Sequence, residues 1–274
     1  MKTFALALGG GGARGLAHIA VIEALDEMGV KPTAIAGTSI GALIGAAYAA
    51  GLRGHDIRHH VIAIAHDRGA TTSRLLAARA GSLADWFSGG WREATLLDAE
   101  KVCASFLPDA VPEDFAALAT PLTVVATDLH AREEAAFAAG ALRPALAASM
   151  AIPGLFRPVT IDGRVYIDGG TTDPLPADQL AGRADIIVAV DVFGAPSTER
   201  VDVPNAFESM FTALLIMGGA IVAAKHRHDP PDLVIRPNVT IFRTLDFYRA
   251  SAILRAADPV KAEVKEKLGA LIGR

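Results

Sequence analysis

The order of apolar and polar positions in the first fifty residues predicts two short strands, each followed by a helix. Thr3–Gly9 is an unbroken apolar run, the pattern of a strand covered on both faces. Leu16–Met28 has apolar residues at helical spacing and ends at Gly29, a typical helix C-cap. A second strand over Pro32–Gly37 precedes a helix of small residues over Ser39–Ala50. The short connections favour parallel pairing of the two strands.

The rest of the chain alternates strands and helices less regularly. Asp162-Gly163 between two β-branched runs predicts a hairpin with a tight turn. The other predicted helices are His55–His66, Ser73–Arg79, Ala99–Phe106, Ala141–Met150 and Pro259–Leu271, the other strands are Leu122–Thr127, Glu134–Phe137, Val159–Ile161, Arg164–Ile167, Asp185–Val190 and Asp232–Arg236, and Gly81–Trp91 is predicted to be irregular. We see no repeat or low-complexity linker, so the pattern predicts one doubly wound α/β domain over residues 1–274.

The longest apolar run is Met210–Ala224, interrupted by Thr212 and by Gly218-Gly219. A helix of that length spans about 22 Å, which is short of the hydrocarbon core of a membrane at about 30 Å. We therefore do not expect a membrane span. The run predicts either a buried or dimer-interface helix, or a helix that lies in a lipid interface.

Composition and charge narrow the classes of function. Of the 274 residues 51% are hydrophobic but only 6% are aromatic, and the mean hydropathy is +0.35. These values fit a membrane protein, a protein with an apolar surface, or a protein with a tight core of small side chains. The formal net charge is −4 and no basic run is present, which argues against a nucleic-acid partner. The single cysteine, Cys103, excludes an intrachain disulfide and a cysteine-based zinc cluster, and fits a reducing compartment.

A glycine-rich loop connects the first predicted strand to the first helix. Gly10, Gly12 and Gly15 satisfy the dinucleotide pattern G-x-G-x-x-G. That interpretation expects an acidic residue at the end of the second strand, where the chain instead has Thr38-Ser39. The lysine of a Walker A loop is also missing. Consecutive glycines before a helix let backbone N–H groups converge on a negative charge, so the loop suits a phosphate or an oxyanion.

A serine lies at the second strand-to-helix connection. Gly37-Thr38-Ser39-Ile40-Gly41 matches G-x-S-x-G, the pattern of a strained turn that exposes a nucleophilic serine. Ser39 could also be a plain helix N-cap, although an N-cap does not require both glycines.

The base that a serine nucleophile needs is less obvious. His226 and His228 lie in a charged segment that predicts a solvated helix end, and His55, His59, His60 and His66 lack acidic companions at metal-ligand spacing, so no metal site is predicted. Asp168 ends a predicted strand and precedes Gly169-Gly170, which would expose its carboxylate at the end of the sheet. An aspartate in an ordinary turn is an equally good interpretation of that position.

Taken together, these motifs resemble the patatin-like phospholipase family. The resemblance is carried by the glycine block Gly9–Gly15, the turn Gly37–Gly41, the segment Ala148–Phe156 and the block Asp168-Gly169-Gly170, all in the family's order. Ala126-Thr127-Asp128-Leu129 also resembles a strand end of the family. The similarity covers roughly residues 1–190, and the chain resembles the bacterial, single-domain type in size.

The resemblance implies a three-layer α/β/α sandwich with a mainly parallel central sheet, and a Ser–Asp dyad without a cofactor or a metal. It implies that Ser39 is the nucleophile and Asp168 the base. The implied oxyanion hole is formed by Gly10, Gly11 and Gly12, and the implied supporting residues are Arg14, Gly37, Gly41, Gly169 and Gly170. Asp173 stands where many members of the family have asparagine, and a carboxylate close to Asp168 would raise the pKa of one of the two.

The expected function is hydrolysis of lipid acyl esters, with phospholipase A, lysophospholipase, esterase and thioesterase activity all left open. Two alternatives remain: a catalytically silent lipid-binding or regulatory module, and a nucleotide-binding Rossmann protein. The expected partners are a lipid or acyl-ester substrate, a membrane contacted peripherally, and a second copy of the chain. The expected location is the cytoplasm, including the inner face of the membrane.

Overall fold

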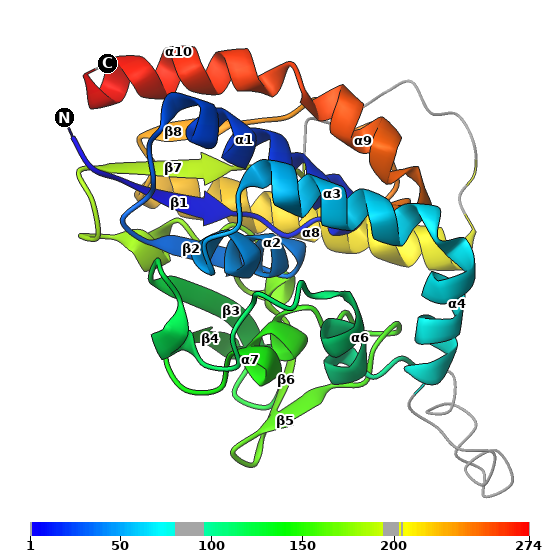
Figure 1. Ribbon diagram of the computed structural model, residues 1–274. Helices are drawn as coiled ribbons and strands as arrows, with labels where there is room; N and C mark the ends of the chain where they lie inside the picture. The colour runs from blue at the N-terminus through cyan, green and yellow to red at the C-terminus, as the bar shows by residue number, and fades with distance from the viewer. Residues whose placement is uncertain (1, 80–95, 194–202, 204, 274) are drawn as a thin grey trace, which may run out of the picture.

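A mostly parallel sheet forms the centre of the computed structural model, which describes residues 2–79, 96–193, 203 and 205–273 (Figure 1). The strands are β1 (Phe4–Leu8), β2 (Ile35–Thr38), β3 (Leu122–Asp128), β4 (Glu133–Phe137), β5 (Val159–Ile161), β6 (Arg164–Asp168), β7 (Ile186–Val190) and β8 (Leu233–Ile235). Their order is β5-β6-β3-β2-β1-β7-β8, and β4 pairs with β3. The predicted parallel pairing of β1 with β2 is confirmed. The stretch predicted to be irregular, Gly81–Trp91, lies outside the described residues.

The helices agree closely with those predicted. They are α1 (His18–Met28), α2 (Ile40–Ala49), α3 (Gly54–His66), α4 (Arg68–Ala77), α6 (Ala99–Phe106), α7 (Leu142–Ser149), α8 (Ala206–His228), α9 (Ala250–Ala257) and α10 (Val260–Ile272), with short 3-10 turns η1 (Gly12–Ala17), η2 (Phe115–Ala117), η3 (Gly169–Thr171), η4 (Asp178–Leu180) and η5 (Phe247–Arg249). Gly29 ends α1 in the left-handed conformation, as predicted. The sequence did not predict α9.

The two faces of the sheet are covered differently, which gives the expected three layers. In β1, Phe4, Leu6 and Leu8 belong to the large core shared with α1 and α10, whereas Ala5 and Ala7 belong to a smaller core that includes Val222 of α8. Figure 1 shows α1, α3 and α10 in front of the sheet and α8 behind it. The small alanine side chains let the second layer pack close to the strands, as the small-residue composition predicted.

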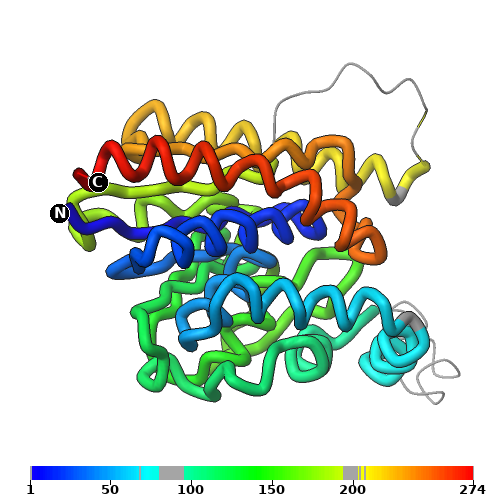
Figure 2. The backbone as a smooth tube through the Cα atoms, turned by 45° about the horizontal axis from the view of Figure 1, so that its top comes forward, coloured from blue at the N-terminus to red at the C-terminus, as the bar shows by residue number. Residues whose placement is uncertain are grey.

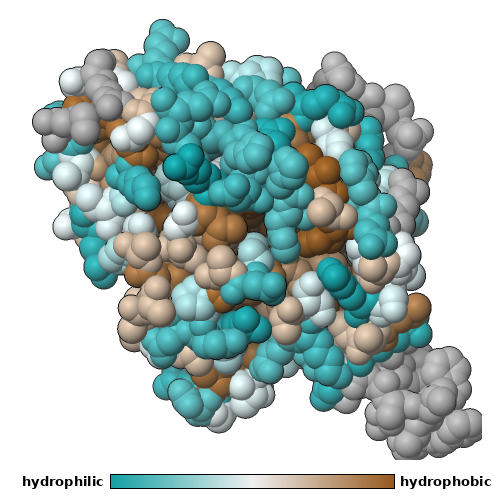
Figure 3. Space-filling view, viewed as in Figure 1, coloured by the Kyte–Doolittle hydropathy of each residue, from teal (hydrophilic) through white to brown (hydrophobic). Residues whose placement is uncertain are grey.

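The surface explains the high mean hydropathy. Hydrophilic residues predominate over much of the face in Figure 3, and apolar residues show in the gaps between them. The large core consists mostly of alanine, valine, leucine and isoleucine. Many of the apolar residues that raise the mean hydropathy are therefore buried in the core, beneath the hydrophilic residues of this face.

Helix α8 corrects a prediction from the sequence. It extends from Ala206 to His228, because Asn205 caps its first turn by accepting a hydrogen bond from the N–H of Glu208. Its 23 residues span about 34 Å, so the argument from length against a membrane span was wrong. By length and composition alone, Glu208–His228 is long and apolar enough to cross a membrane, and only 17% of its most apolar window is buried. Within the single chain this helix is therefore not buried, which leaves the dimer-interface and lipid-interface alternatives as predictions.

The edges of β3 explain how distant residues meet. Residues 124 and 125 of β3 pair with both β2 and β4, and residues 126–128 pair with both β4 and β6. Strands β2 and β6 therefore share one edge of β3, and β4 occupies the other. Thr38 pairs with Val125 and Asp168 pairs with Ala126, so the ends of β2 and β6 are adjacent.

The two chain ends lie at the opposite end of the sheet from this junction. Figure 2 shows the termini side by side, and the N–H of Lys2 donates to the carbonyl of Ile272 at 3.2 Å. The connections that follow β1 and β2 therefore lie together at the carboxyl end of the parallel strands, where ligands bind in open α/β sheets.

Candidate active site

Ser39 occupies a strained turn between β2 and α2. Its backbone has φ 55° and ψ −124°, a conformation that costs a residue other than glycine about 1–3 kcal/mol. The side chain is 6% exposed. Ala42 and Leu43 donate their N–H groups to the carbonyl of Ser39, so α2 begins directly at the serine. The expectation of a plain N-cap is wrong, because the Ser39 side chain makes no capping hydrogen bond.

Ser149 of α7 fixes this turn from behind. The N–H of Ser39 donates to Ser149 Oγ at 2.8 Å, and Ser149 Oγ donates to the carbonyl of Val125 at 2.6 Å. Ser149 is completely buried. It therefore satisfies a buried N–H that would otherwise lack a partner. The sequence analysis found Ser149 only within a resembling segment; a serine in a helix of buried alanine and leucine was the available signal.

The carboxylate of Asp168 meets the hydroxyl of Ser39. Ser39 Oγ donates to Asp168 Oδ2 at 2.7 Å, and the N–H of Gly170 donates to Asp168 Oδ1 at 2.7 Å. Asp168 ends β6 and is 7% exposed. Burial raises the pKa of its carboxyl from 3.8 to about 6, although both hydrogen bonds act in the opposite direction. The geometry is that of a nucleophile and its base.

The glycine loop presents two N–H groups to the same cavity. Gly10, Gly11 and Gly12 all line the cavity together with Ser39. The N–H of Gly10, however, donates to the carbonyl of Pro174 at 2.9 Å. The prediction that Gly10 donates to an oxyanion is therefore corrected, because that hydrogen is already engaged. The N–H groups of Gly11 and Gly12 make no hydrogen bond to any described residue.

Thr244 lies against the glycine loop and lines the same cavity. Gly12 has φ 61°, and a Cβ at this position would lie 2.2 Å from the carbonyl oxygen of Thr244. The same carbonyl accepts a hydrogen bond of 2.7 Å from the N–H of Ala13. Only glycine fits position 12, because any side chain would displace the segment that carries Thr244.

Arg14 supports the loop without facing the dyad. Its guanidinium donates to the carbonyls of Phe242 at 2.8 Å, Phe193 at 3.0 Å and Thr240 at 3.2 Å. These three acceptors lie on segments that follow β7 and β8. Arg14 thus ties the start of η1 to the segments that follow the neighbouring strands β7 and β8.

The four supporting glycines allow close backbone approach. A Cβ on Gly41 would lie 2.2 Å from the carbonyl oxygen of Leu8, and one on Gly169 would lie 2.2 Å from that of Val125. A Cβ on Gly37 would lie 2.7 Å from backbone atoms of α2. Gly170 supplies the N–H that binds the base. These contacts hold the ends of β1, β2, β3 and β6 together around the serine.

The cavity around Ser39 has an apolar wall. Its volume is about 60 Å³, and its lining includes Ile152, Pro153 and Phe193 together with Phe211, Leu214 and Leu215 of α8. Helix α8 therefore has one side on the dyad and another side exposed, with Ile216 68% exposed and Met217 54% exposed.

Asp173 belongs to a separate charged cluster. Lys225 of α8 lies 2.9 Å from carboxylate oxygens of Asp173, Glu134 and Asp178. Asp173 is completely buried, and burial together with nearby Asp178 raises the pKa of its carboxyl. The predicted coupling of Asp173 to Asp168 is not found, since the pKa of Asp168 depends on burial, Ser39 and Gly170. The three carboxylates approach within 4.8 Å, as metal ligands would, but the ammonium of Lys225 already supplies the compensating charge.

Replacement of Lys225 tests this cluster. Lys225→Met should lower the free energy of unfolding by roughly 3 kcal/mol, because it leaves the buried Asp173 beside two other carboxylates without a cation. Lys225→Met combined with Asp173→Asn should recover most of that loss. Urea denaturation at pH 8 measures both, and a loss below about 0.5 kcal/mol in the single variant would show that the ion pairs contribute little.

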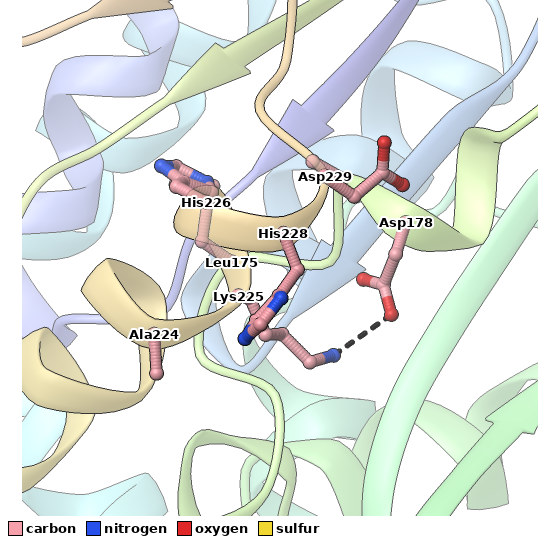
Figure 4. Close-up of a pocket in the computed structure, with 8 residues that line it drawn as sticks. Leu175, Asp178, Ala224, Lys225, His226, His228 and Asp229 are labelled. Atoms are coloured by element: carbon pink, nitrogen blue, oxygen red, sulfur yellow. Dashed lines mark hydrogen bonds and ion pairs between the residues drawn. The ribbon is translucent and has the colours of Figure 1, made fainter.

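A second cavity lies beside this cluster at the end of α8 (Figure 4). It has a volume of about 330 Å³ and is lined by His226, His228 and Asp229 as well as Lys225 and Asp178. The sequence analysis set aside both histidines as bases. The structure agrees, because neither of them lines the cavity that contains Ser39.

Comparison with known proteins finds a matching family model and several relatives. The sequence matches the family model named Patatin-like phospholipase over residues 6–181. It is 41% identical over 203 residues to an uncharacterised NTE family protein of Mycobacterium bovis, covering 73% of this chain and 52% of that protein. It is 28% identical over 295 residues to lysophospholipase NTE1 of Yarrowia lipolytica, covering 94% of this chain and 19% of that protein. The chain thus spans about half, or less, of the length of these curated relatives.

The fold also has a counterpart among solved structures. The crystal structure of VipD from Legionella pneumophila matches with a TM-score of 0.51 at 15% identity, covering 97% of this chain and 66% of that one. At this identity the likeness concerns the fold alone. It agrees with the helix-flanked, mainly parallel sheet described above.

Proposed function

Because the chain belongs to the patatin-like phospholipase family, we propose that it is a serine acyl-ester hydrolase of lipid substrates that acts through a Ser39–Asp168 dyad. The observation that carries the proposal is the 2.7 Å hydrogen bond from Ser39 Oγ to Asp168 Oδ2, in a cavity that also contains two unengaged N–H groups. The lysophospholipase among the relatives supports a lipid ester as the substrate. We further propose that residues 1–274 act as one domain in the cytoplasm.

In the first half of the reaction, Asp168 Oδ2 accepts the proton from Ser39 Oγ while the oxygen attacks the acyl carbonyl. The negative charge that develops on the carbonyl oxygen is stabilised by the N–H groups of Gly11 and Gly12 and by the N-terminal end of α2. Loss of one such donor typically costs about 2.7–4 kcal/mol of transition-state stabilisation. Asp168 then gives its proton to the departing alcohol.

In the second half, a water molecule attacks the acyl-serine and Asp168 accepts its proton. The same N–H groups stabilise the second tetrahedral intermediate. Collapse of that intermediate releases the fatty acid and returns the proton to Ser39. A dyad suffices for both halves because the Gly170 N–H orients Asp168 as it takes and returns the proton.

The pH dependence of activity follows from Asp168. Burial raises the pKa of this carboxyl to about 6, and only the ionised form accepts the serine proton. We expect kcat/KM to rise about tenfold per pH unit below pH 6 and to level off above it. A pH profile with a soluble p-nitrophenyl ester measures this. An inflection near pH 4 would mean that the base is an ordinary exposed carboxylate.

Entry of an acyl chain requires α8 to move. The cavity of about 60 Å³ is far smaller than the roughly 300–1,000 Å³ of sites that enclose whole ligands. Phe211, Leu214 and Leu215 form its α8 wall, so a shift of this helix would open an apolar groove beside Ser39.

A substrate panel tests the proposed function. Purified protein is assayed with p-nitrophenyl esters, lysophospholipids and diacyl phospholipids, and hydrolysis of at least one lipid ester is expected. A protein that cleaves none of them and fails to react with a fluorophosphonate probe at Ser39 would be a silent lipid-binding module instead.

The outer side of α8 supports a peripheral contact with membranes. Between Glu208 and Lys225 the helix carries no charged residue, and Ile216 and Met217 are exposed. Burial of such side chains in a lipid interface contributes about 1.5–3 kcal/mol each. The double variant I216Q/M217Q should therefore bind phosphatidylcholine vesicles at least about tenfold more weakly, as measured by vesicle flotation.

The matched control for this experiment is Leu271→Gln. Leu271 is an exposed apolar residue near the end of α10, at the end of the molecule where the termini lie. Vesicle binding should be unchanged in this variant, and both proteins should hydrolyse a soluble ester at the wild-type rate. Equal vesicle binding by I216Q/M217Q and the wild type would exclude α8 as the contact.

A further inference from the structure

His18 is a buried histidine that the proposed mechanism does not use. It is the first residue of α1, directly after the glycine loop and η1. Its side chain is completely buried, and burial lowers the pKa of the ring to about 4. The ring is therefore neutral at physiological pH, with one nitrogen protonated and the other not.

The hydrogen bond of His18 identifies the protonated nitrogen. Nε2 lies 2.7 Å from the carbonyl oxygen of Gly9. A carbonyl oxygen can only accept, so Nε2 carries the proton and Nδ1 does not. Nδ1 is buried and makes no hydrogen bond to any described residue. The one hydrogen bond of this ring within the described part of the chain is thus directed at the first residue of the glycine block.

The peptide between Gly9 and Gly10 is bound on both sides. His18 Nε2 donates to its carbonyl oxygen, and its N–H donates to the carbonyl of Pro174 at 2.9 Å. A peptide unit is planar, so two hydrogen bonds at opposite edges fix the orientation of the whole plane. The chain then continues into Gly11 and Gly12, whose N–H groups make no hydrogen bond to any described residue, so the orientation of the preceding peptide bears directly on where these N–H groups point.

We propose that His18 is a positioning residue for the oxyanion hole: its Nε2–H orients the Gly9–Gly10 peptide and thereby directs the N–H groups of Gly11 and Gly12 at the reacting carbonyl. The catalytic part of this inference rests on the proposed hydrolase function. Pro174 lies six residues after the base Asp168, so the same peptide also connects the oxyanion loop to the segment that carries the base.

Two substitutions separate positioning from packing. His18→Leu keeps an apolar side chain in the core but removes the donor. His18→Gln keeps a donor, because the side-chain amide nitrogen of glutamine reaches about as far from Cα as Nε2 of histidine. A residue that only fills space would tolerate leucine as well as glutamine, whereas a positioning residue would tolerate only glutamine.

The kinetic test uses the full chain and a soluble p-nitrophenyl ester. His18→Leu should lower kcat about 100-fold with less than about a threefold change in KM, because misdirected N–H groups stabilise the transition state poorly. His18→Gln should stay within about fivefold of the wild-type kcat. An unchanged kcat in His18→Leu, or an equal loss in both variants, would overturn the proposal.

His60→Leu is the matched control. His60 Nε2 also lies 2.8 Å from a backbone carbonyl, that of Phe106, but on α3 and away from the cavity that contains Ser39. This variant removes a histidine-to-carbonyl hydrogen bond of the same kind from a half-buried position, so it should lose some stability in urea denaturation and keep the wild-type kcat. A parallel fall of kcat in His60→Leu would show that activity follows general stability.

A measurement without catalysis keeps the proposal separate from the hydrolase function. NMR of the wild type should find His18 protonated at Nε2 alone at pH 6, and amide hydrogen exchange at Gly10 should be faster in His18→Leu than in His18→Gln. A wild type that hydrolyses no ester but gives these results would refute the proposed function. It would still support the role of His18 in orienting the Gly9–Gly10 peptide. A His18 ring protonated at Nδ1, or equal amide exchange at Gly10 in both variants, would refute this role of His18.

Discussion

Replacement of Ser39 by alanine should lower kcat for ester hydrolysis by at least about 10⁴-fold, the scale on which serine hydrolases depend on their catalytic groups. In the proposed mechanism this hydroxyl is the attacking group, and no other described serine donates to a buried carboxylate in that cavity. The variant should also fail to react with a fluorophosphonate probe, whereas the wild type should be labelled on the peptide that contains Ser39. Both results are read by ester assay and by mass spectrometry.

A second substitution at this position separates chemistry from strain. Ser39→Gly should be as inactive as Ser39→Ala, but its free energy of unfolding should be higher by about 1 kcal/mol, because glycine adopts φ 55° without steric cost. Chemical denaturation of both variants measures the difference. Residual activity above about 1% of wild type in either protein would place the nucleophile elsewhere. Equal free energies of unfolding for the two variants would mean that the turn at Ser39 is not strained.

The sequence predicted the local parts of this site well. The glycine block and the serine turn each lie within seven consecutive residues between a strand and a helix, so short-range patterns suffice to locate them. The Asp162-Gly163 turn is a similar case: the predicted hairpin is present, and both turn residues have positive φ. Such elements are determined by what the backbone can adopt over a few residues.

The meeting of Ser39 and Asp168 could not be predicted from residue patterns alone. The two are 129 positions apart and meet because β2 and β6 share one edge of β3. From the sequence, Asp168 in an ordinary turn was as good an interpretation, and only the family resemblance decided between them. The hydrogen bond from the Gly10 N–H to Pro174 could not be predicted either, because Pro174 follows β6 and is far from Gly10 in the sequence.

Helix α8 shows a different kind of error. Asn205 followed by Glu208 is a helix-start signal, and the basic residues up to His228 are typical of a last turn. The apolar run alone lies between these two signals, so it predicted a helix that is too short. The sequence pointed to Arg14 and Asp173 but not to their partners, which lie 179 to 228 positions from Arg14 and 52 positions from Asp173, so no local pattern identifies them.

Asp168→Asn should abolish activity and at the same time stabilise the protein at alkaline pH. An amide cannot accept the serine proton, so kcat should fall by about 10⁴-fold, as for loss of a catalytic aspartate elsewhere. The side chain has nearly the same shape and can still contact Ser39 and Gly170. The loss of activity is measured with the soluble ester, and the fold is checked by circular dichroism.

The gain in stability follows from the direction of the pKa shift. Burial raises the pKa of Asp168 from 3.8 in the unfolded chain to about 6 in the folded one. Between these values the folded protein binds more protons than the unfolded chain, so the free energy of unfolding falls as the pH rises. The stabilising contribution is complete below about pH 3.8 and is lost above about pH 6, and the shift corresponds to about 3 kcal/mol.

Asparagine removes this dependence because it carries no charge at any pH. The difference in unfolding free energy between Asp168→Asn and the wild type should therefore grow in favour of the variant from pH 4 to pH 8 and then stay constant. Other titrating groups cancel in this difference, since both proteins contain them. A difference that does not change with pH would mean that Asp168 ionises as an ordinary carboxylate. The raised pKa proposed for this base would then be wrong.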